Sequence, residues 1–355
     1  MNEFKYTAKD FKSDQEVRWC PGCGDYAIMN AIQRTMAEMN VPHEQFAVVS
    51  GIGCSSRFPY YMSTYGFHSI HGRAAAIASG VKTANPDLSV WVISGDGDSM
   101  AIGGNHFIHA VRRNVNLNLV LFNNKIYGLT KGQYSPTSER GLITKTSPFG
   151  TIESPFVPGQ LVLGCGGTFF ARAVDNNMVH TQEVLKIAAE HHGASIVEVL
   201  QNCVIFSDGV HEEIANAKVR KERQVFLEHG KPMLFGNDLE KGIVMKKGKL
   251  QVVTLGEDGY TLDDVLIHDA HEEDPTLHLA LVNMKYPDFP VAMGVIRDVK
   301  ALVYDEEMQK QIAEVQSKRK LESLEAIFYS GNTWEVNDEM SSEPIPFFKK
   351  IGLMK

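Results

Sequence analysis

The stretch VWVISGDGDSMAIGGNHFIHAVRRNVNLNLVLFNN, residues 90–124, contains two short apolar runs separated by a segment with helical character. Val90–Ile93 and Leu117–Phe122 have the length and composition of buried strands, and residues 104–113 are predicted to form the helix between them. The other predicted elements are strands at 46–49 and 195–200, a helix capped by Asp25, and helices over 73–84 and 181–191. This alternation predicts an α/β fold with a mainly parallel sheet covered by helices on both faces.

Polar motifs follow the two strands of this stretch. Gly95-Asp96-Gly97-Asp98 ends the first strand, and Asn123-Asn124 ends the second. Glycines allow backbone amides to approach a phosphate, and carboxylate, amide and backbone oxygens suit a magnesium ion. Asp96, the side chain of Asn124 and the backbone carbonyl of Ile126 are therefore candidate magnesium ligands beside a diphosphate. The alternative is that both motifs are only turns that join sheet elements.

Composition limits the possible classes of protein. The 355 residues include 35 Lys and Arg against 43 Asp and Glu, a formal net charge of −8, with 43% hydrophobic and 22% charged residues. These values are typical of a globular chain, and the charge disfavours a general nucleic-acid binder. The sequence has no apolar run long enough for a membrane span and no apolar stretch typical of a secretory signal, so we expect a cytoplasmic protein that does not bind membranes.

Five cysteines are an odd number, and a cytoplasmic chain has little use for disulfides. Cys20 and Cys23 have the spacing of metal ligands, whereas Cys54 and Cys203 are single residues at predicted strand ends. Four cysteines brought together at one sheet edge would suit a cubane iron-sulfur cluster, and zinc is the alternative. Cys165 is expected to be a small buried residue.

The order of these motifs resembles a known family. TrpCysProGlyCysGly at 19–24, GlyIleGlyCysSerSer at 51–56, GDGD followed by AsnAsn, and GlnAsnCys at 201–203 are similar to the β subunits of 2-oxoacid:ferredoxin oxidoreductases. The GDG and NN pair itself resembles the thiamine-diphosphate signature. The similarity is strongest to the 2-oxoglutarate branch and covers roughly the first 235 residues.

The resemblance implies a site with three groups: thiamine diphosphate, Mg²⁺ and a [4Fe-4S] cluster. It implies that Cys20, Cys23, Cys54 and Cys203 hold the cluster and that Asp96, Asn124 and Ile126 hold the magnesium. The implied cofactor-binding residues are Ile52, Gly53, Cys54, Ser55, His71, Gly72, Arg73, Ala74, Gly97, Asp98, Gly128 and Leu129. His71 and Arg57 are the implied catalytic residues, with Arg57 binding a substrate carboxylate by two parallel hydrogen bonds. The alternatives are that His71 is a histidine buried by packing and that Arg57 is a surface arginine. The resemblance also implies that residues 127–137 form a loop that would close over the cofactor.

The implied reaction is the thiamine- and coenzyme A-dependent oxidative decarboxylation of 2-oxoglutarate to succinyl-CoA, or its reversal to fix carbon dioxide. Electrons would pass through the cluster to ferredoxin. The implied obligate partner is an α subunit that supplies a pyrimidine-binding domain and an activating Glu, in an αβ or α2β2 assembly. A pyruvate or broad 2-oxoacid enzyme, a non-redox thiamine decarboxylase or synthase, and a zinc-stabilised non-catalytic binding subunit are the alternatives.

A change in composition near residue 230 predicts a boundary between a cofactor domain, 1–230, and a C-terminal extension, 231–355. The extension is expected to contain a small hairpin with its turn at 246–248 and an amphipathic helix over 305–328. Between them, residues 263–275 are expected to form a solvated acidic loop, carrying His268 and His271 without a metal.

Overall fold

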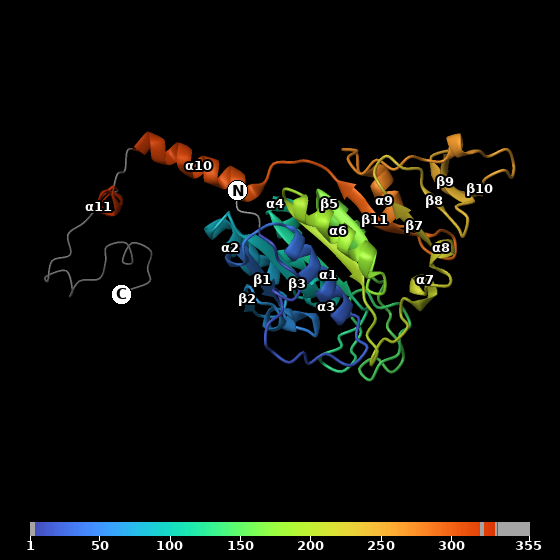
Figure 1. The fold of residues 1–355 in the computed structure, drawn as a ribbon, viewed down its shortest axis with the longest axis horizontal. Helices are drawn as coiled ribbons and strands as arrows, with labels where there is room; N and C mark the ends of the chain where they lie inside the picture. The colour runs from blue at the N-terminus through green and yellow to red at the C-terminus, as the bar shows by residue number, and fades with distance from the viewer. Residues whose placement is uncertain (1–3, 320–322, 331, 333–355) are drawn as a thin grey trace, which may run out of the picture. The chain divides into compact units, whose positions relative to one another are not determined.

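A computed structural model describes residues 4–319, 323–330 and 332 (Figure 1). Its main sheet has the strand order β2-β1-β3-β4-β6-β5-β11-β7. The strands are β1 Phe46–Ser50, β2 Tyr65–His68, β3 Ser89–Gly95, β4 Leu117–Asn123, β5 Phe169–Val174, β6 Ala194–Leu200, β7 Gln224–Leu227 and β11 Val291–Asp298. All neighbouring pairs are parallel except β5 and β11, which run antiparallel. The predicted α/β fold with a mainly parallel sheet is confirmed.

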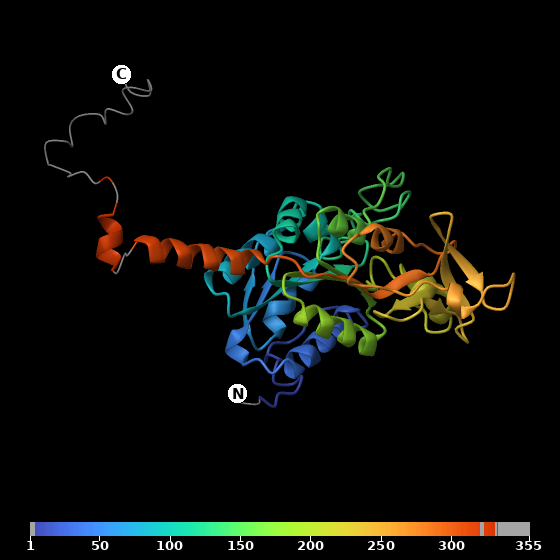
Figure 2. The same ribbon diagram turned by 90° about the horizontal axis from the view of Figure 1, so that it is seen from above.

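Helices cover both faces of this sheet (Figure 2). The helices that pack on its faces are α1 Asp25–Glu38, α2 Ala74–Ala84, α4 Gly104–Arg113, α5 Pro158–Gly164, α6 Met178–Glu190 and α9 Thr276–Val282. The other helices are α3 Asp96–Met100, α7 Glu212–Ala215, α8 Arg220–Arg223, α10 Tyr304–Arg319 and α11 Leu324–Phe328, and the 3-10 turns are η1 His43–Gln45, η2 Ser55–Tyr61 and η3 Leu262–Asp264. Alternate strand residues divide between two cores, because successive side chains of a strand point to opposite faces. Val48 and Trp91 pack with α1 and α6, whereas Val49 and Val92 pack with α2, α4, α5 and α9.

The carboxyl ends of four adjacent strands meet at one edge of the sheet. Ser50 of β1 pairs with Ile93 of β3, Gly95 of β3 with Phe122 of β4, and Asn123 of β4 with Leu200 of β6. The motifs at 51–54, 96–98, 124–126 and 201–203 therefore begin beside one another, at the edge where open parallel sheets bind ligands.

The structure differs from the boundary predicted at residue 230. One compact unit spans Met1–Met308, and β11 lies inside the main sheet between β5 and β7. Residues 231–308 are therefore built into the cofactor domain rather than added to it. The predicted hairpin is confirmed, since β8 Leu234–Phe235, β9 Lys241–Lys246 and β10 Lys249–Thr254 form a small antiparallel sheet. The second unit begins at Gln309.

Several local predictions need correction. Gly24, not Asp25, caps α1, and Asp25 opens its first turn. His268 is fully buried and bonds the Val295 carbonyl at 2.8 Å, so the acidic loop is only partly solvated. The helix predicted over 305–328 is divided into α10 and α11, and residues 320–322 of that prediction lie outside the described residues.

Cys165 directly follows α5, is partly buried and packs against the core.

Within the described ranges, no helix has both the length and the hydropathy required to cross a bilayer.

Candidate functional site

Asp98 links two turns and the end of β3 at this edge of the sheet. One oxygen of its buried carboxylate, Oδ1, accepts hydrogen bonds from the backbone N–H of Ile52 at 3.0 Å and of Gly72 at 2.7 Å, and lies 2.6 Å from His71 Nδ1. The other oxygen, Oδ2, accepts from Ser94 at 2.5 Å. The predicted cofactor residues Ile52, His71 and Gly72 are thus brought together, and the Asp98 side chain itself is occupied in holding them.

Asp96, a predicted magnesium ligand, opens α3 directly after β3. Its carboxylate is 2% exposed, and Oδ2 accepts hydrogen bonds from Ser135 Oγ at 2.5 Å and from Thr137 Oγ1. Burial raises the pKa of Asp96 to about 6, while the two hydroxyl donors act to lower it. A buried carboxylate without a basic partner is a good hard-oxygen site for a divalent cation.

The turn after β4 carries the other predicted magnesium ligands. Asn124 Oδ1 accepts a hydrogen bond from the Ile126 backbone N–H at 3.2 Å, which closes the turn. Tyr127 then reaches back and donates to the Gly97 carbonyl at 2.9 Å. A Cβ atom at Gly97 would lie only 2.3 Å from the Tyr127 ring, so this close approach requires glycine. The GDG motif is therefore in contact with the turn that follows the NN motif.

The four predicted cluster cysteines line one cavity of about 200 Å³. Cys20 and Cys23 precede α1, Cys54 follows β1 and Cys203 follows β6. The same cavity is lined by Asn124, Arg57, Gly128 and Leu129, so the cysteines and the predicted thiamine residues share one space. The predicted convergence of these cysteines at one sheet edge is confirmed.

Cys23 and Cys54 are partly buried beside a buried carboxylate. Burial raises the pKa of Cys54 to about 12 and raises that of Cys23 further still. Asp25 stands beside both thiols, and burial and Asp175 raise its pKa to about 7. Its Oδ2 has no hydrogen-bond partner among the residues that the structure describes. Buried thiols of this kind become thiolates only when metal binding compensates the charge.

The spacing of the cysteines bears on which metal they would hold. In the described part of the chain, no three His, Cys, Asp or Glu side chains approach closely enough to bind one ion. Zinc needs four ligands around a single atom, with sulfurs at about 2.3 Å from it. In a cubane cluster each cysteine binds a different iron, which places the sulfurs further apart. Cys thiolates are the usual ligands of such clusters, and four cysteines line this cavity.

Gly128 lies between two of the predicted cluster ligands. A Cβ atom there would stand 3.5 Å from Cys54 Sγ and 3.6 Å from Cys203 Sγ, in van der Waals contact with both sulfurs, so a larger side chain would enter the space beside them.

The remaining predicted site residues occupy the same edge. Arg57 lies on η2, three residues after Cys54, and is half-buried at the cysteine cavity. Arg73 is the N-cap of α2 and the buried Ala74 is its first residue. Ser55 opens η2, and Gly53 has a φ of 147°, in the region that favours glycine. A contact between Arg57 and a substrate stays a prediction.

Sequence reasoning missed the hydroxyl groups that support these ligands. Ser135, Thr137 and Ser138 follow β4 by a dozen residues and return to Asp96 and to Lys125. The only signal was the run of hydroxyl residues around Pro136, which is equally typical of an ordinary turn.

Comparison with known proteins first defines a class. The C-terminal TPP binding domain of thiamine pyrophosphate enzymes matches residues 51–199, which include the Asp98 turns, Asp96 and Asn124. The chain is also similar to a solved 2-oxoglutarate:ferredoxin oxidoreductase from Magnetococcus marinus with 2-oxoglutarate, coenzyme A and succinyl-CoA bound. The TM-score is 0.73 and the identity 32%, over 92% of this chain and 97% of that chain.

Two curated relatives define the family within this class. The chain is 46% identical to the 2-oxoglutarate oxidoreductase subunit KorB of Mycobacterium tuberculosis, over 93% of this chain and 88% of the relative. It is 45% identical to the β subunit of 2-oxoacid:ferredoxin oxidoreductase 1 of Aeropyrum pernix, over 59% of this chain and 64% of that subunit. The chain belongs to the β subunits of the 2-oxoacid:ferredoxin oxidoreductase family.

Replacing Gly128 with valine is expected to remove most of the bound iron, because the side chain would enter the space between Cys54 and Cys203. Iron and acid-labile sulfide, measured on anaerobically purified protein, test this result. Gly164→Ala is the matched control, since a Cβ atom there meets no other atom within 4 Å. Wild-type iron content in Gly128→Val would show that the cluster lies elsewhere.

Proposed function

We propose that this chain is the β subunit of a 2-oxoglutarate:ferredoxin oxidoreductase. The enzyme decarboxylates 2-oxoglutarate oxidatively, transfers the succinyl group to coenzyme A and passes the electron pair to ferredoxin. The observation that carries the proposal is the shared cavity, in which four cysteines face the turn of Asn124, Gly128 and Leu129. A non-redox thiamine enzyme would have no need of these four thiols.

The chain's own residues bind and orient the reacting groups. Asp96, Asn124 and the Ile126 carbonyl would hold Mg²⁺ and with it the diphosphate, while the four cysteines would hold the cluster. Thiamine diphosphate, when bound, supplies carbanion stabilisation for cleavage beside a keto group, and the cluster supplies one-electron transfer. His71 is fixed by Asp98, whose carboxylate accepts a hydrogen bond from Nδ1–H, and Nε2 is left for a contact outside that pair. Arg57 offers a guanidinium for the carboxylate of a 2-oxoacid.

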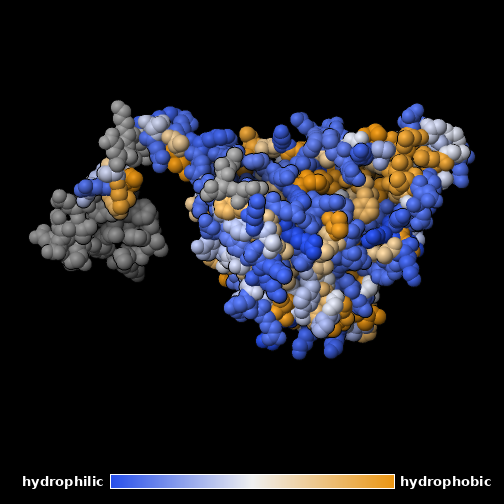
Figure 3. Space-filling model, viewed as in Figure 1, coloured by the Kyte–Doolittle hydropathy of each residue, from blue (hydrophilic) through white to orange (hydrophobic). Residues whose placement is uncertain are grey.

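An α subunit would complete the site. Leu129 and the loop that follows carry exposed apolar side chains, including Ile143, Phe149 and Ile152, which are 70%, 99% and 82% exposed. Figure 3 shows apolar patches at the lower end of the chain, where the loops at this edge of the sheet lie. Apolar surface of this kind is typical of a protein interface. We infer that the loop contacts the α subunit, which supplies the pyrimidine-binding domain and the activating Glu.

The test is ferredoxin reduction by co-expressed α and β chains, with 2-oxoglutarate and pyruvate compared at equal concentration. We expect coenzyme A-dependent reduction with 2-oxoglutarate, at least tenfold faster than with pyruvate, a difference of about 1.4 kcal/mol in transition-state binding. The β chain alone is the control and should be inactive. Equal rates with both acids would indicate a broad 2-oxoacid enzyme. Turnover without any electron acceptor would contradict the proposal, and so would a purified complex that contains zinc instead of iron.

A further inference from the structure

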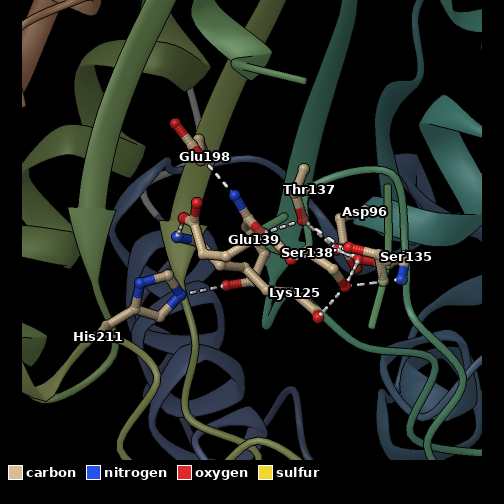
Figure 4. Close-up of polar contacts among 10 residues, drawn as sticks. Asp96, Lys125, Ser135, Thr137, Ser138, Glu139, Glu198 and His211 are labelled. Atoms are coloured by element: carbon tan, nitrogen blue, oxygen red, sulfur yellow. Dashed lines mark hydrogen bonds and ion pairs between the residues drawn. The ribbon is translucent and has the colours of Figure 1, made fainter. Parts of the chain in front are cut away.

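The segment Ser135–Glu139 contacts both parts of the predicted magnesium site (Figure 4). It reaches Asp96 at the end of β3 and the turn that follows β4. We refer to the side chains of Ser135, Thr137 and Ser138 as the hydroxyl clamp. None of these three residues is itself a predicted metal ligand.

The first half of the clamp holds Asp96. The hydroxyls of Ser135 and Thr137 both donate to the same carboxylate oxygen, Oδ2. Both hydroxyl residues are almost fully buried, at 3% and 2% exposure. Among the described residues, no side chain donates to Oδ1 of Asp96, so the clamp fixes one oxygen and leaves the other free of side-chain donors. Hydrogen bonds to a charged acceptor are short and strong, which fixes the carboxylate in one rotamer.

The second half holds the turn with the other ligands. Ser138 Oγ donates to the Lys125 carbonyl at 2.6 Å and accepts the Ser135 backbone N–H at 2.8 Å. Glu139 forms an ion pair with Lys125 Nζ at 2.5 Å. Lys125 has a φ of 56°, in the left-handed region that non-glycine residues rarely adopt, and it lies between the two ligands of the turn. Contacts that hold Lys125 in this conformation also hold Asn124 and Ile126.

The clamp is anchored to the interior of the sheet. Thr137 Oγ1 also lies 2.9 Å from Asn123 Oδ1, so its single proton is shared between this oxygen and Asp96 Oδ2, while Ser135 donates to Asp96. Asn123 Nδ2 donates to Glu198 Oε1 at 2.7 Å. Glu198 forms a buried ion pair with Arg172 at 2.7 Å. The charged pair orients the Asn123 amide, because a carboxylate can only accept, and its Oδ1 then faces Thr137. The ligand segments are thereby linked to β4, β5 and β6.

We propose that Ser135, Thr137 and Ser138 are positioning residues that hold Asp96 and the Asn124–Ile126 turn in the geometry for Mg²⁺ and thiamine diphosphate. The inference rests on the proposed function, because it requires magnesium at Asp96. Mg²⁺ tolerates little deviation from octahedral geometry, so its ligands must be held before it binds. Side chains behind metal ligands typically contribute about 10–100-fold to metal affinity.

The test uses the co-expressed αβ complex, stripped of Mg²⁺ and thiamine diphosphate under anaerobic conditions. Titration calorimetry then measures the Mg²⁺ dependence of thiamine diphosphate binding for wild type, Thr137→Val and Thr137→Ser. We expect about 10–100-fold weaker Mg²⁺ binding for Thr137→Val, with recovery in Thr137→Ser, which keeps the hydroxyl. Iron content should be unchanged in both. Thr83→Val is the matched control, since among the described residues this hydroxyl bonds only the Ser79 and Gly80 carbonyls of its own helix, α2.

A second variant tests the proposal independently in case Thr137→Val does not fold. Ser135→Ala removes one donor to the same oxygen with less change in shape, and it should also weaken Mg²⁺ binding. Wild-type Mg²⁺ affinity in both Thr137→Val and Ser135→Ala would overturn the clamp, and so would a Thr137→Ser variant as weak as Thr137→Val. If Asp96→Ala also binds Mg²⁺ and thiamine diphosphate like wild type, the magnesium assignment itself fails. That outcome is distinct from failure of the clamp alone.

Discussion

Replacing Asp96 with alanine in the αβ complex is expected to weaken Mg²⁺ and thiamine diphosphate binding together, by about 100-fold or more. Removing a side chain behind a metal ligand typically costs about 10–100-fold in metal affinity, and Asp96 is a predicted ligand itself, so its loss should cost at least as much. Its carboxylate is buried, and no other carboxylate of the two motifs is free to replace it, since Asp98 is occupied by Ile52, Gly72, His71 and Ser94. Calorimetry with Mg²⁺ and the cofactor measures both affinities.

Two further variants separate the causes of that loss. Asp96→Asn keeps the size of the side chain and one carbonyl oxygen, so any loss in this variant reports the charge rather than packing. Asp87→Ala removes an exposed carboxylate that precedes β3 and should bind both ligands like wild type. The iron content of all three variants should match wild type. If Asp96→Ala retained wild-type affinity for Mg²⁺ and for the cofactor, the GDG motif would have no metal role.

The centre of the sheet could be predicted from sequence, whereas its outer strands could not. β1 and β3 contain uninterrupted apolar runs, and the strands β4 and β6 are mostly apolar, with Asn118 in β4 and Ser195 and Glu198 in β6 as the interruptions. β5 and β11 contain Arg172 and Arg297, which resemble surface residues. In the structure both arginines are buried, because Arg172 pairs with Glu198 and Arg297 donates to backbone carbonyls of distant segments. Those partners become neighbours only in the folded chain.

The same limit applies to the site. Ligands that directly follow strands could be placed together, because parallel strands end at a common edge. The hydroxyl clamp could not be predicted from the sequence, because Ser135 and Thr137 are 39 and 41 residues from Asp96 and lie in an irregular loop. The acidic sequence around His268 predicts a solvated position for a similar reason. Its hydrogen-bond partner, the Val295 carbonyl on β11, is distant in the sequence and becomes a neighbour only in the folded chain. Periodicity carries no information on such contacts.

Replacing Cys203 with serine is expected to abolish the cluster and leave thiamine diphosphate binding intact. A hydroxyl has a far higher pKa than a thiol and is a poor ligand for iron-sulfur clusters, which are held by thiolates. The backbone at Cys203 is held independently of the sulfur, because its carbonyl accepts a hydrogen bond from the Ser207 N–H at 3.1 Å. The fold should therefore survive the change. Visible absorbance and iron content of the anaerobic αβ complex measure the cluster, and calorimetry measures the cofactor.

Cys165→Ser is the matched control for this variant. Cys165 is a partly buried cysteine that follows α5 and packs against the core, and it does not line the cysteine cavity. Its replacement should leave iron content and ferredoxin reduction at wild-type levels, whereas Cys203→Ser should lose both. An intact cluster signal in Cys203→Ser would remove this residue from the ligand set. Loss of the cluster in Cys165→Ser as well would mean that serine substitution disturbs the fold. Cys54→Ser would then test the ligand set independently, because Cys54 follows β1 and Cys203 follows β6.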